Sequence, residues 1–119
     1  MDFKNQKAIY LQIAEHICNA ILAGRYTENG KLPSVREYAA EVEVNVNTVA
    51  RSFEWLQMHD IVTVRRGLGN YVALGALREI EAIRKEEFFN EQLPELFRSM
   101  QALGITLAEV QQQYRQFVS

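Results

Sequence analysis

Hydrophobic residues recur at helical spacing through the first part of the chain. Between residues 7 and 22 they form two neighbouring rows: Ile9, Ile13, Ile17 and Ile21, and beside them Leu11, Ala14, Cys18 and Leu22. This pattern predicts a helix with a wide buried face, and Gly24 is placed to end it.

Two shorter helices with their own start signals follow the first. Ser34 and Glu37 form a capping box, in which the serine hydroxyl accepts from the backbone of residue 37 and the glutamate reaches back to the cap. Asn45 suits the start of the next helix, because its side chain can accept from the backbone N–H of Asn47 or Thr48. Two capped helices about three residues apart fit a helix-turn-helix, and they also fit an ordinary helical hairpin.

The last of these helices has opposed apolar and polar faces. At about 100° per residue, Val49, Phe53 and Leu56 fall together, with Val46 alongside. The outward side chains near its N-terminal end suit a DNA major groove: Asn47, Thr48 and Arg51. Asparagine can pair with adenine, arginine with guanine, and threonine with a phosphate or a thymine methyl group. The alternative is a polar face that is simply solvated.

A β-hairpin is predicted directly after the helices. Residues 61–64 and 71–74 have strand composition. The turn between them carries two arginines and two glycines: Arg65, Arg66, Gly67 and Gly69. Glycines let a hairpin tip approach a phosphate backbone closely, and the arginines supply positive charge there. A solvated basic turn is the alternative, whereas a nucleotide-binding loop fits poorly because a strand follows, not a helix.

Three helices followed by a basic hairpin form a winged helix-turn-helix, a fold that is mainly α with a small β-hairpin. Three segments resemble the signature blocks of the GntR family of bacterial transcription regulators: residues 32–37, 45–51 and 66–72. The resemblance covers about residues 8–73. The form Asn-x-Asn-Thr-Val-Ala-Arg, with a short helical tail, is most similar to the YtrA-like branch, which implies DNA binding by a homodimer.

The resemblance also implies which residues contact DNA. The matching positions are Arg36 in the second helix, Asn47, Thr48 and Arg51 in the recognition helix, and Arg66 with Gly67 in the wing. Val46 and Ala50 stand where other branches carry arginine, which removes two contacts. Glu43 stands where the turn between the helices commonly has glycine, so we expect that turn to be made without a left-handed residue at this site.

The charge distribution bears on DNA binding more than the net charge of −2 does. Residues 1–75 carry eight Lys or Arg and eight Asp or Glu, and residues 76–119 carry five against seven. A neutral DNA-binding domain must concentrate its positive charge on one face. The candidates for that face are Arg36, Arg51, Arg65 and Arg66, with Lys31 in addition. Non-specific DNA binding should then be weak and sensitive to salt.

The tail, residues 75–119, is predicted to be helical. Pro94 should start a helix or kink a long one, Gly104 suits a helix end, and Thr106 with Glu109 forms a second capping box. The tail is rich in aromatic residues: Phe88, Phe89, Phe97, Tyr114 and Phe117. This surface is too large to bury within one short appendage, so we expect the tail to pair two copies of the chain. The alternative is that the tail folds back on its own domain.

These observations predict a DNA-binding domain over residues 1–74 and a dimerisation tail over residues 75–119. We expect a homodimeric regulator, a repressor more than an activator, on a near-palindromic operator. An interaction module that kept the winged-helix shape and lost DNA affinity is the alternative. An effector is not evident, because the tail is too short to dimerise and also enclose a cavity of roughly 300 Å³ or more. A small pocket between tail and wing would be the exception.

Other function classes are not indicated. The chain has no Ser/His/Asp set and no metal-ligand spacing, and His16 and His59 are isolated, so we expect no enzyme, cofactor or metal. Cys18 is the only cysteine, which suits the cytoplasm. The first five residues hold no apolar signal core, and no run reaches the roughly 18 apolar residues of a membrane span.

Overall fold

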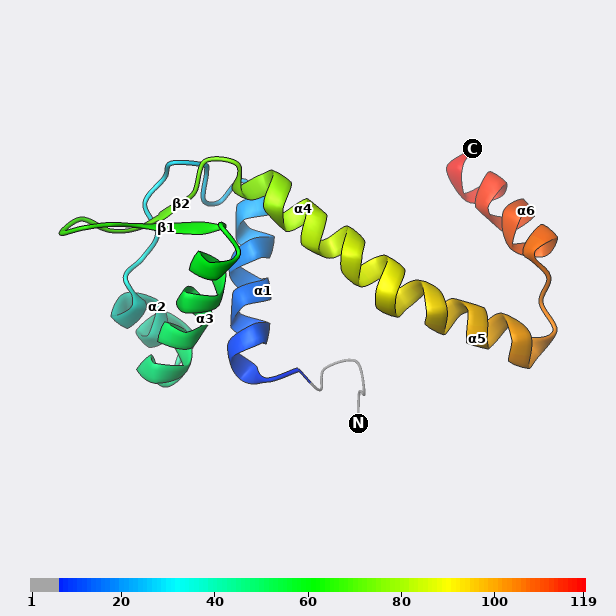
Figure 1. The fold of residues 1–119 in the computed structure, drawn as a ribbon, viewed down its shortest axis with the longest axis horizontal. Helices are drawn as coiled ribbons and strands as arrows, with labels where there is room; N and C mark the ends of the chain where they lie inside the picture. The colour runs from blue at the N-terminus through cyan, green and yellow to red at the C-terminus, as the bar shows by residue number, and fades with distance from the viewer. Residues whose placement is uncertain (1–6) are drawn as a thin grey trace. The chain divides into compact units, whose positions relative to one another are not determined.

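The computed structural model describes residues 7–119, so the segment in which a signal core was sought lies outside the described residues. The chain divides into two compact units, described separately below: the first ends at Ala82, and the second is Ile83–Ser119 (Figure 1). The functional boundary after residue 74 stays a prediction. None of the helices within the described residues is long and apolar enough to cross a membrane.

The first unit is built on three helices, α1 (Ile9–Leu22), α2 (Val35–Val42) and α3 (Val46–Met58). α3 packs against both α1 and α2. The core contains most of the predicted apolar rows: Ile13, Ala14, Ile17, Cys18 and Ile21 from α1, and Val49, Phe53 and Leu56 from α3. Ile9 and Leu22, expected in the same rows, are exposed because they lie at the two ends of α1. Tyr38 of α2 meets Phe53 edge to face at 6.2 Å between ring centres. Val46, expected alongside the buried face, is 41% exposed because it opens the first turn of α3.

The turn between α2 and α3 differs from expectation. Glu43 ends α2 in the left-handed conformation, with φ 56° and ψ 46°. This conformation lets the N–H of Val44 donate to the carbonyl oxygen of Ala39 at 3.1 Å. The expectation of a turn without a left-handed residue here was therefore wrong. The geometry of the turn requires that conformation, and a glutamate adopts it where glycine would do so without steric cost.

The predicted hairpin is present, with its strands nearer the tip than expected. β1 (Val62–Arg65) pairs antiparallel with β2 (Gly69–Val72), and Arg65 lies opposite Gly69. The turn is therefore only residues 66–68, and we call the hairpin with this turn the wing. Lys31 forms an isolated bridge with Tyr71, so the segment before α2 pairs with β2. The hairpin extends away from the three helices (Figure 1).

Helices make up the rest of the chain. α4 (Ala76–Glu87) crosses the boundary between the units and is followed by the π-helical segment η2 (Phe88–Gln92) and by α5 (Leu93–Leu103). Pro94 lies in the first turn of α5, directly after the π-helical bond from Leu93 N–H to the Phe88 carbonyl. Gly104 ends α5 with φ 67°, and the capping box of Thr106 and Glu109 opens α6 (Leu107–Val118), both as predicted.

Candidate nucleic-acid interface

The first candidate residue, Arg36, is held at the N-terminal end of α2. The Ser34 hydroxyl accepts from the backbone N–H of Glu37 at 3.1 Å, and the Glu37 carboxylate accepts from the backbone N–H of Ser34 at 2.9 Å. These bonds, the one from the Ser34 backbone foremost, lower the pKa of Glu37 below its ordinary value. The capping box therefore favours an ionised glutamate and fixes the turn that exposes Arg36 to solvent.

The N-terminal half of α3 carries three more candidates. The Asn45 side chain accepts from the backbone N–H of Asn47 at 2.8 Å, which confirms the predicted cap. Asn47 and Arg51 are exposed, and Thr48 is partly buried. Three apolar residues of α3 are buried on the opposite side, so the polar face of α3 is left to solvent. Glu54, one turn from Arg51 on the same polar face, is also exposed and brings a negative charge to it.

Arg51 has a neighbour that the sequence pattern did not indicate. Its guanidinium carbon lies 3.9 Å from the ring centre of Tyr10, in the first turn of α1. The Ser52 hydroxyl, one residue along, donates to the carbonyl oxygen of Tyr10 at 2.7 Å. Ser52 is fully buried, although its polarity placed it outside the apolar pattern. Arg51 is thus stacked on an aromatic ring of another helix.

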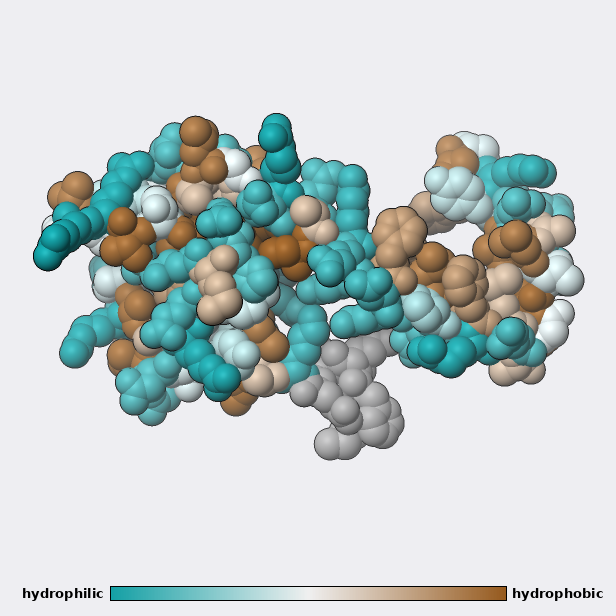
Figure 2. Space-filling view, in the orientation of Figure 1, coloured by the Kyte–Doolittle hydropathy of each residue, from teal (hydrophilic) through white to brown (hydrophobic). Residues whose placement is uncertain are grey.

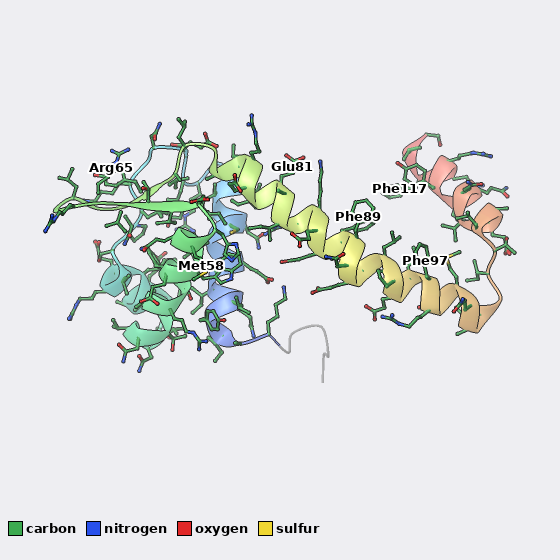
Figure 3. The ribbon with its side chains drawn as sticks, viewed as in Figure 1. Met58, Arg65, Glu81, Phe89, Phe97 and Phe117 are labelled. Atoms are coloured by element: carbon green, nitrogen blue, oxygen red, sulfur yellow. The ribbon has the colours of Figure 1, made fainter. Side chains whose placement is uncertain are left out.

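The wing holds the remaining candidates: Arg65, Arg66 and Gly67. All three are exposed, and Gly67 has φ +77°, a conformation that favours glycine. Arg65 lies on the wing (Figure 3). Its guanidinium carbon lies over the ring of Tyr71, 3.9 Å from the ring centre, on the same hairpin. Lys31 lies across Gly69, where an added Cβ would be 3.5 Å from its Cε atom. Two of the predicted basic residues thus lie on the wing, and Lys31 lies beside it.

A hydrogen bond links α3 to the wing. The side-chain amide of Gln57, near the end of α3, donates to the Asn70 side-chain oxygen in β2 at 3.4 Å. Together with the bond from Ser52 to Tyr10, this contact ties α3 to the wing on one side and to α1 on the other. The candidate residues therefore sit on elements of one unit that are joined to each other.

A pocket of about 320 Å³ lies elsewhere on the first unit, between α1 and α2. Its polar lining includes His16, Asn19, Arg25, Tyr38 and Glu41. Tyr38 places its hydroxyl 3.5 Å from His16 Nδ1, and burial raises the pKa of this tyrosine. The pocket is not the one considered between tail and wing, and the expectation about an effector, possible but not evident, stays a prediction. Within residues 7–119, no three His, Cys, Asp or Glu side chains are grouped to hold a metal ion.

The family model for bacterial regulatory proteins of the gntR family matches residues 9–72, which span all three helices and the wing. The chain belongs to the GntR family. It is a DNA-binding transcription regulator of that family, and neither the family nor the relatives below are named as enzymes. The winged-helix fold predicted from the sequence is confirmed.

Similar proteins extend the match into the tail. The uncharacterized HTH-type transcriptional regulator YhcF of Bacillus subtilis is 37% identical over 91% of this chain and 88% of its own. The HTH-type transcriptional repressor YtrA of the same organism is 30% identical over 92% of this chain and 84% of its own. A GntR-family regulator from Bacteroides thetaiotaomicron is 47% identical, covers 93% of this chain and 96% of its own, and superposes with a TM-score of 0.83. These similarities support the YtrA-like assignment.

Proposed function

We propose that this GntR-family regulator is a homodimeric repressor that reads a near-palindromic operator with the N-terminal half of α3. The observation that carries the proposal is the exposed polar face of α3. Asn47 and Arg51 lie on that face, while the opposite face is buried against α1 and α2. A helix that is anchored on one side and polar on the other can lie in a major groove without unfolding.

The side chains fall into two roles by chemistry. Arg51 and Asn47 can each form two hydrogen bonds with one base, guanine and adenine respectively, so we assign base readout to them. Arg36, Thr48 and Arg66 can bind phosphates and fix the register of the protein on DNA. Arg65 adds positive charge to the wing, and Gly67 lets the turn approach the backbone closely.

The tail supports a dimer. In the described ranges Leu93–Leu103 and Leu107–Val118, neither α5 nor α6 has a buried residue. Helices of this length are marginal in water unless an apolar face is covered. Phe97 is 48% exposed and Phe117 85%. Phe89, Phe97 and Phe117 lie on the sides of η2, α5 and α6 that face one another (Figure 3), where apolar side chains gather (Figure 2). The same helices of a second copy would cover this surface.

A dimer would set the symmetry of the operator. Two recognition helices related by a two-fold axis require two half-sites of inverted sequence, about one helical turn of DNA apart. Repression follows if such a site overlaps a promoter, because the bound dimer would then exclude RNA polymerase. The similarity to YtrA, named as a repressor, over most of both chains favours repression over activation.

Fluorescence anisotropy tests the proposal. The full-length protein is titrated into labelled DNA from upstream of its own gene, and into a scrambled duplex, at two salt concentrations. We expect tighter binding to the upstream DNA, with affinities for both duplexes that fall as salt rises. The repressor assignment predicts that deletion of the gene raises expression from a promoter carrying the bound site. Unchanged or lower expression would contradict it.

An interaction module is the second candidate, and the charge of α3 favours it. Glu54 is exposed on the polar face, and Val46 and Ala50 leave that helix with Arg51 as its single basic residue. Equal weak affinity for both duplexes at both salt concentrations would support this candidate over the regulator.

A further inference from the structure

We propose that Tyr10 is a positioning residue for base readout, because its ring holds the guanidinium of Arg51 at the edge of the recognition helix. The inference rests on the proposed function, in which Arg51 reads a base. It adds a residue of α1, outside the helix-turn-helix, to the determinants of sequence specificity.

The contact between the two side chains is close. The guanidinium carbon of Arg51 lies 3.9 Å from the centre of the Tyr10 ring, well inside the roughly 6 Å within which a cation is attracted to an aromatic face. Arg51 is exposed, so without the ring its long side chain would sample many rotamers in water. The ring therefore restricts the side chain before DNA arrives.

The backbone that carries the ring is held in place. The carbonyl oxygen of Tyr10 accepts from the Ser52 hydroxyl at 2.7 Å, and Ser52 directly follows Arg51 in the chain. This bond, donated by a buried serine, joins the backbone of one stacking partner to the residue beside the other. The two helices therefore meet at a fixed point next to the stack, and Arg51 cannot easily move away from Tyr10 with its helix.

Stacking leaves the chemistry for base recognition available. A guanidinium stacks through its flat face, while its N–H groups point outward in the plane. Those in-plane donors are the ones that contact O6 and N7 of guanine. A stacked arginine can therefore still donate two hydrogen bonds to a base, and it loses less conformational freedom on binding than an unrestrained one.

The proposal predicts the direction in which removal of the Tyr10 ring changes the affinity for the operator. If the stack prepares Arg51 for the base, removal of the ring weakens operator binding. If the stack instead holds Arg51 away from DNA, removal of the ring strengthens binding. The second result would overturn the proposal.

The base pair read by Arg51 is first identified as the one at which Arg51→Ala loses its preference. Dissociation constants are then measured for the operator and for operators substituted at that base pair. We expect Tyr10→Leu to weaken operator binding by about two- to five-fold, and Tyr10→Phe, which keeps the ring, to bind like the wild type. In the Arg51→Ala background, Tyr10→Leu should have no further effect on affinity or base preference. If Tyr10→Leu lowers operator affinity as much in the Arg51→Ala background as in the wild type, Tyr10 acts on the structure of the protein and not through Arg51. That result would overturn the proposal.

Tyr71→Leu is the matched control, because it removes the other stack of the same length, that of Arg65. It should weaken binding while leaving discrimination at the base pair read by Arg51 unchanged. Thermal unfolding shows whether each variant is folded. If Tyr10→Leu does not fold, NMR of the wild type tests the stack instead. The ring of Tyr10 should shift the side-chain protons of Arg51 upfield. Unshifted protons would overturn the proposal.

Failure of the proposed function has a different signature. In that case, the wild type would not distinguish the operator from scrambled DNA, and Arg51→Ala would bind as the wild type does. If the wild type does discriminate and Arg51→Ala loses one base preference, but Tyr10→Leu behaves as the wild type, only the positioning role is wrong.

Discussion

The hydroxyl of Ser52 in α3 donates a hydrogen bond of 2.7 Å to the carbonyl oxygen of Tyr10 in α1. Within residues 7–119, Ser52 is the buried polar residue of the core, among the apolar residues that α1 and α3 share. A directional bond in an apolar interface sets how one helix lies on the other more narrowly than packing alone does. The recognition helix is therefore oriented by a polar contact that no apolar pattern could indicate.

Replacement of Ser52 by alanine should lower stability. Ser52→Ala removes the hydrogen bond and leaves a small void, so we expect the free energy of unfolding to fall by about 1 kcal/mol. Urea unfolding followed by circular dichroism measures it. Ser99→Ala makes the same change at an exposed helical position and should shift stability by no more than about 0.5 kcal/mol. Equal effects of the two substitutions would mean that the Ser52 bond contributes nothing.

The capping box of α2 predicts a dependence of stability on pH. Hydrogen bonds from Ser34 lower the pKa of Glu37 below its ordinary value of 4.5. Because the folded state favours the ionised form, this stabilisation is fully present above that pH and is lost as the pH falls through the lowered pKa. Glu37→Gln should therefore lower the melting temperature at pH 7 relative to the wild type, and the difference should shrink below pH 4.5. A difference independent of pH would contradict the role of the carboxylate.

The left-handed Glu43 offers a stabilising substitution. Glu43→Gly removes the steric cost of φ 56° for a residue with a side chain, so we expect the free energy of unfolding to rise by about 1 kcal/mol. Ala40→Gly, at an exposed right-handed position in α2, should lower it by a similar amount. Urea unfolding measures both changes. A gain of stability in Glu43→Gly with a loss in Ala40→Gly supports the left-handed conformation of Glu43, and a loss of stability in both variants would refute it.

The sequence predicted most of the first unit because its signals are local. Capping at Ser34 and Asn45, and the apolar rows of α1 and α3, depend on residues within one or two turns of each other. The contacts around the site are long-range: Tyr10 with Arg51, and Lys31 with Tyr71. Periodicity cannot indicate which surface residues of different elements meet. The conformation of Glu43 was missed for a related reason, since the requirements of the turn outweigh the preference of the residue.

The proposed dimer predicts the effect of a charge on the apolar side of α5. Phe97→Glu should weaken self-association by at least about tenfold, because an ionised side chain would have to be buried in the interface. Ala102→Glu adds the same charge on the other side of α5 and should leave the dimer intact. Sedimentation velocity distinguishes the species. A wild type that stays monomeric at micromolar concentrations would refute dimerisation by the tail.

Two arginines should have different effects on DNA binding. Arg51→Ala should cost about 1–3 kcal/mol and relax the preference at one base pair. Arg66→Ala should weaken binding to all sequences about equally and reduce the slope of log affinity against log salt by about 1. Titrations against the operator and its single-base variants separate these outcomes. Base-specific losses with Arg66→Ala, or uniform losses with Arg51→Ala, would reverse the assigned roles.

The most direct test of the account is a selection of DNA from a random-sequence pool by the purified full-length protein. Recognition by a homodimer through α3 predicts enrichment of an inverted repeat, whose half-sites are centred about one helical turn apart. Enrichment of a single asymmetric site would contradict the homodimer, and a pool that stays random would contradict sequence-specific recognition itself.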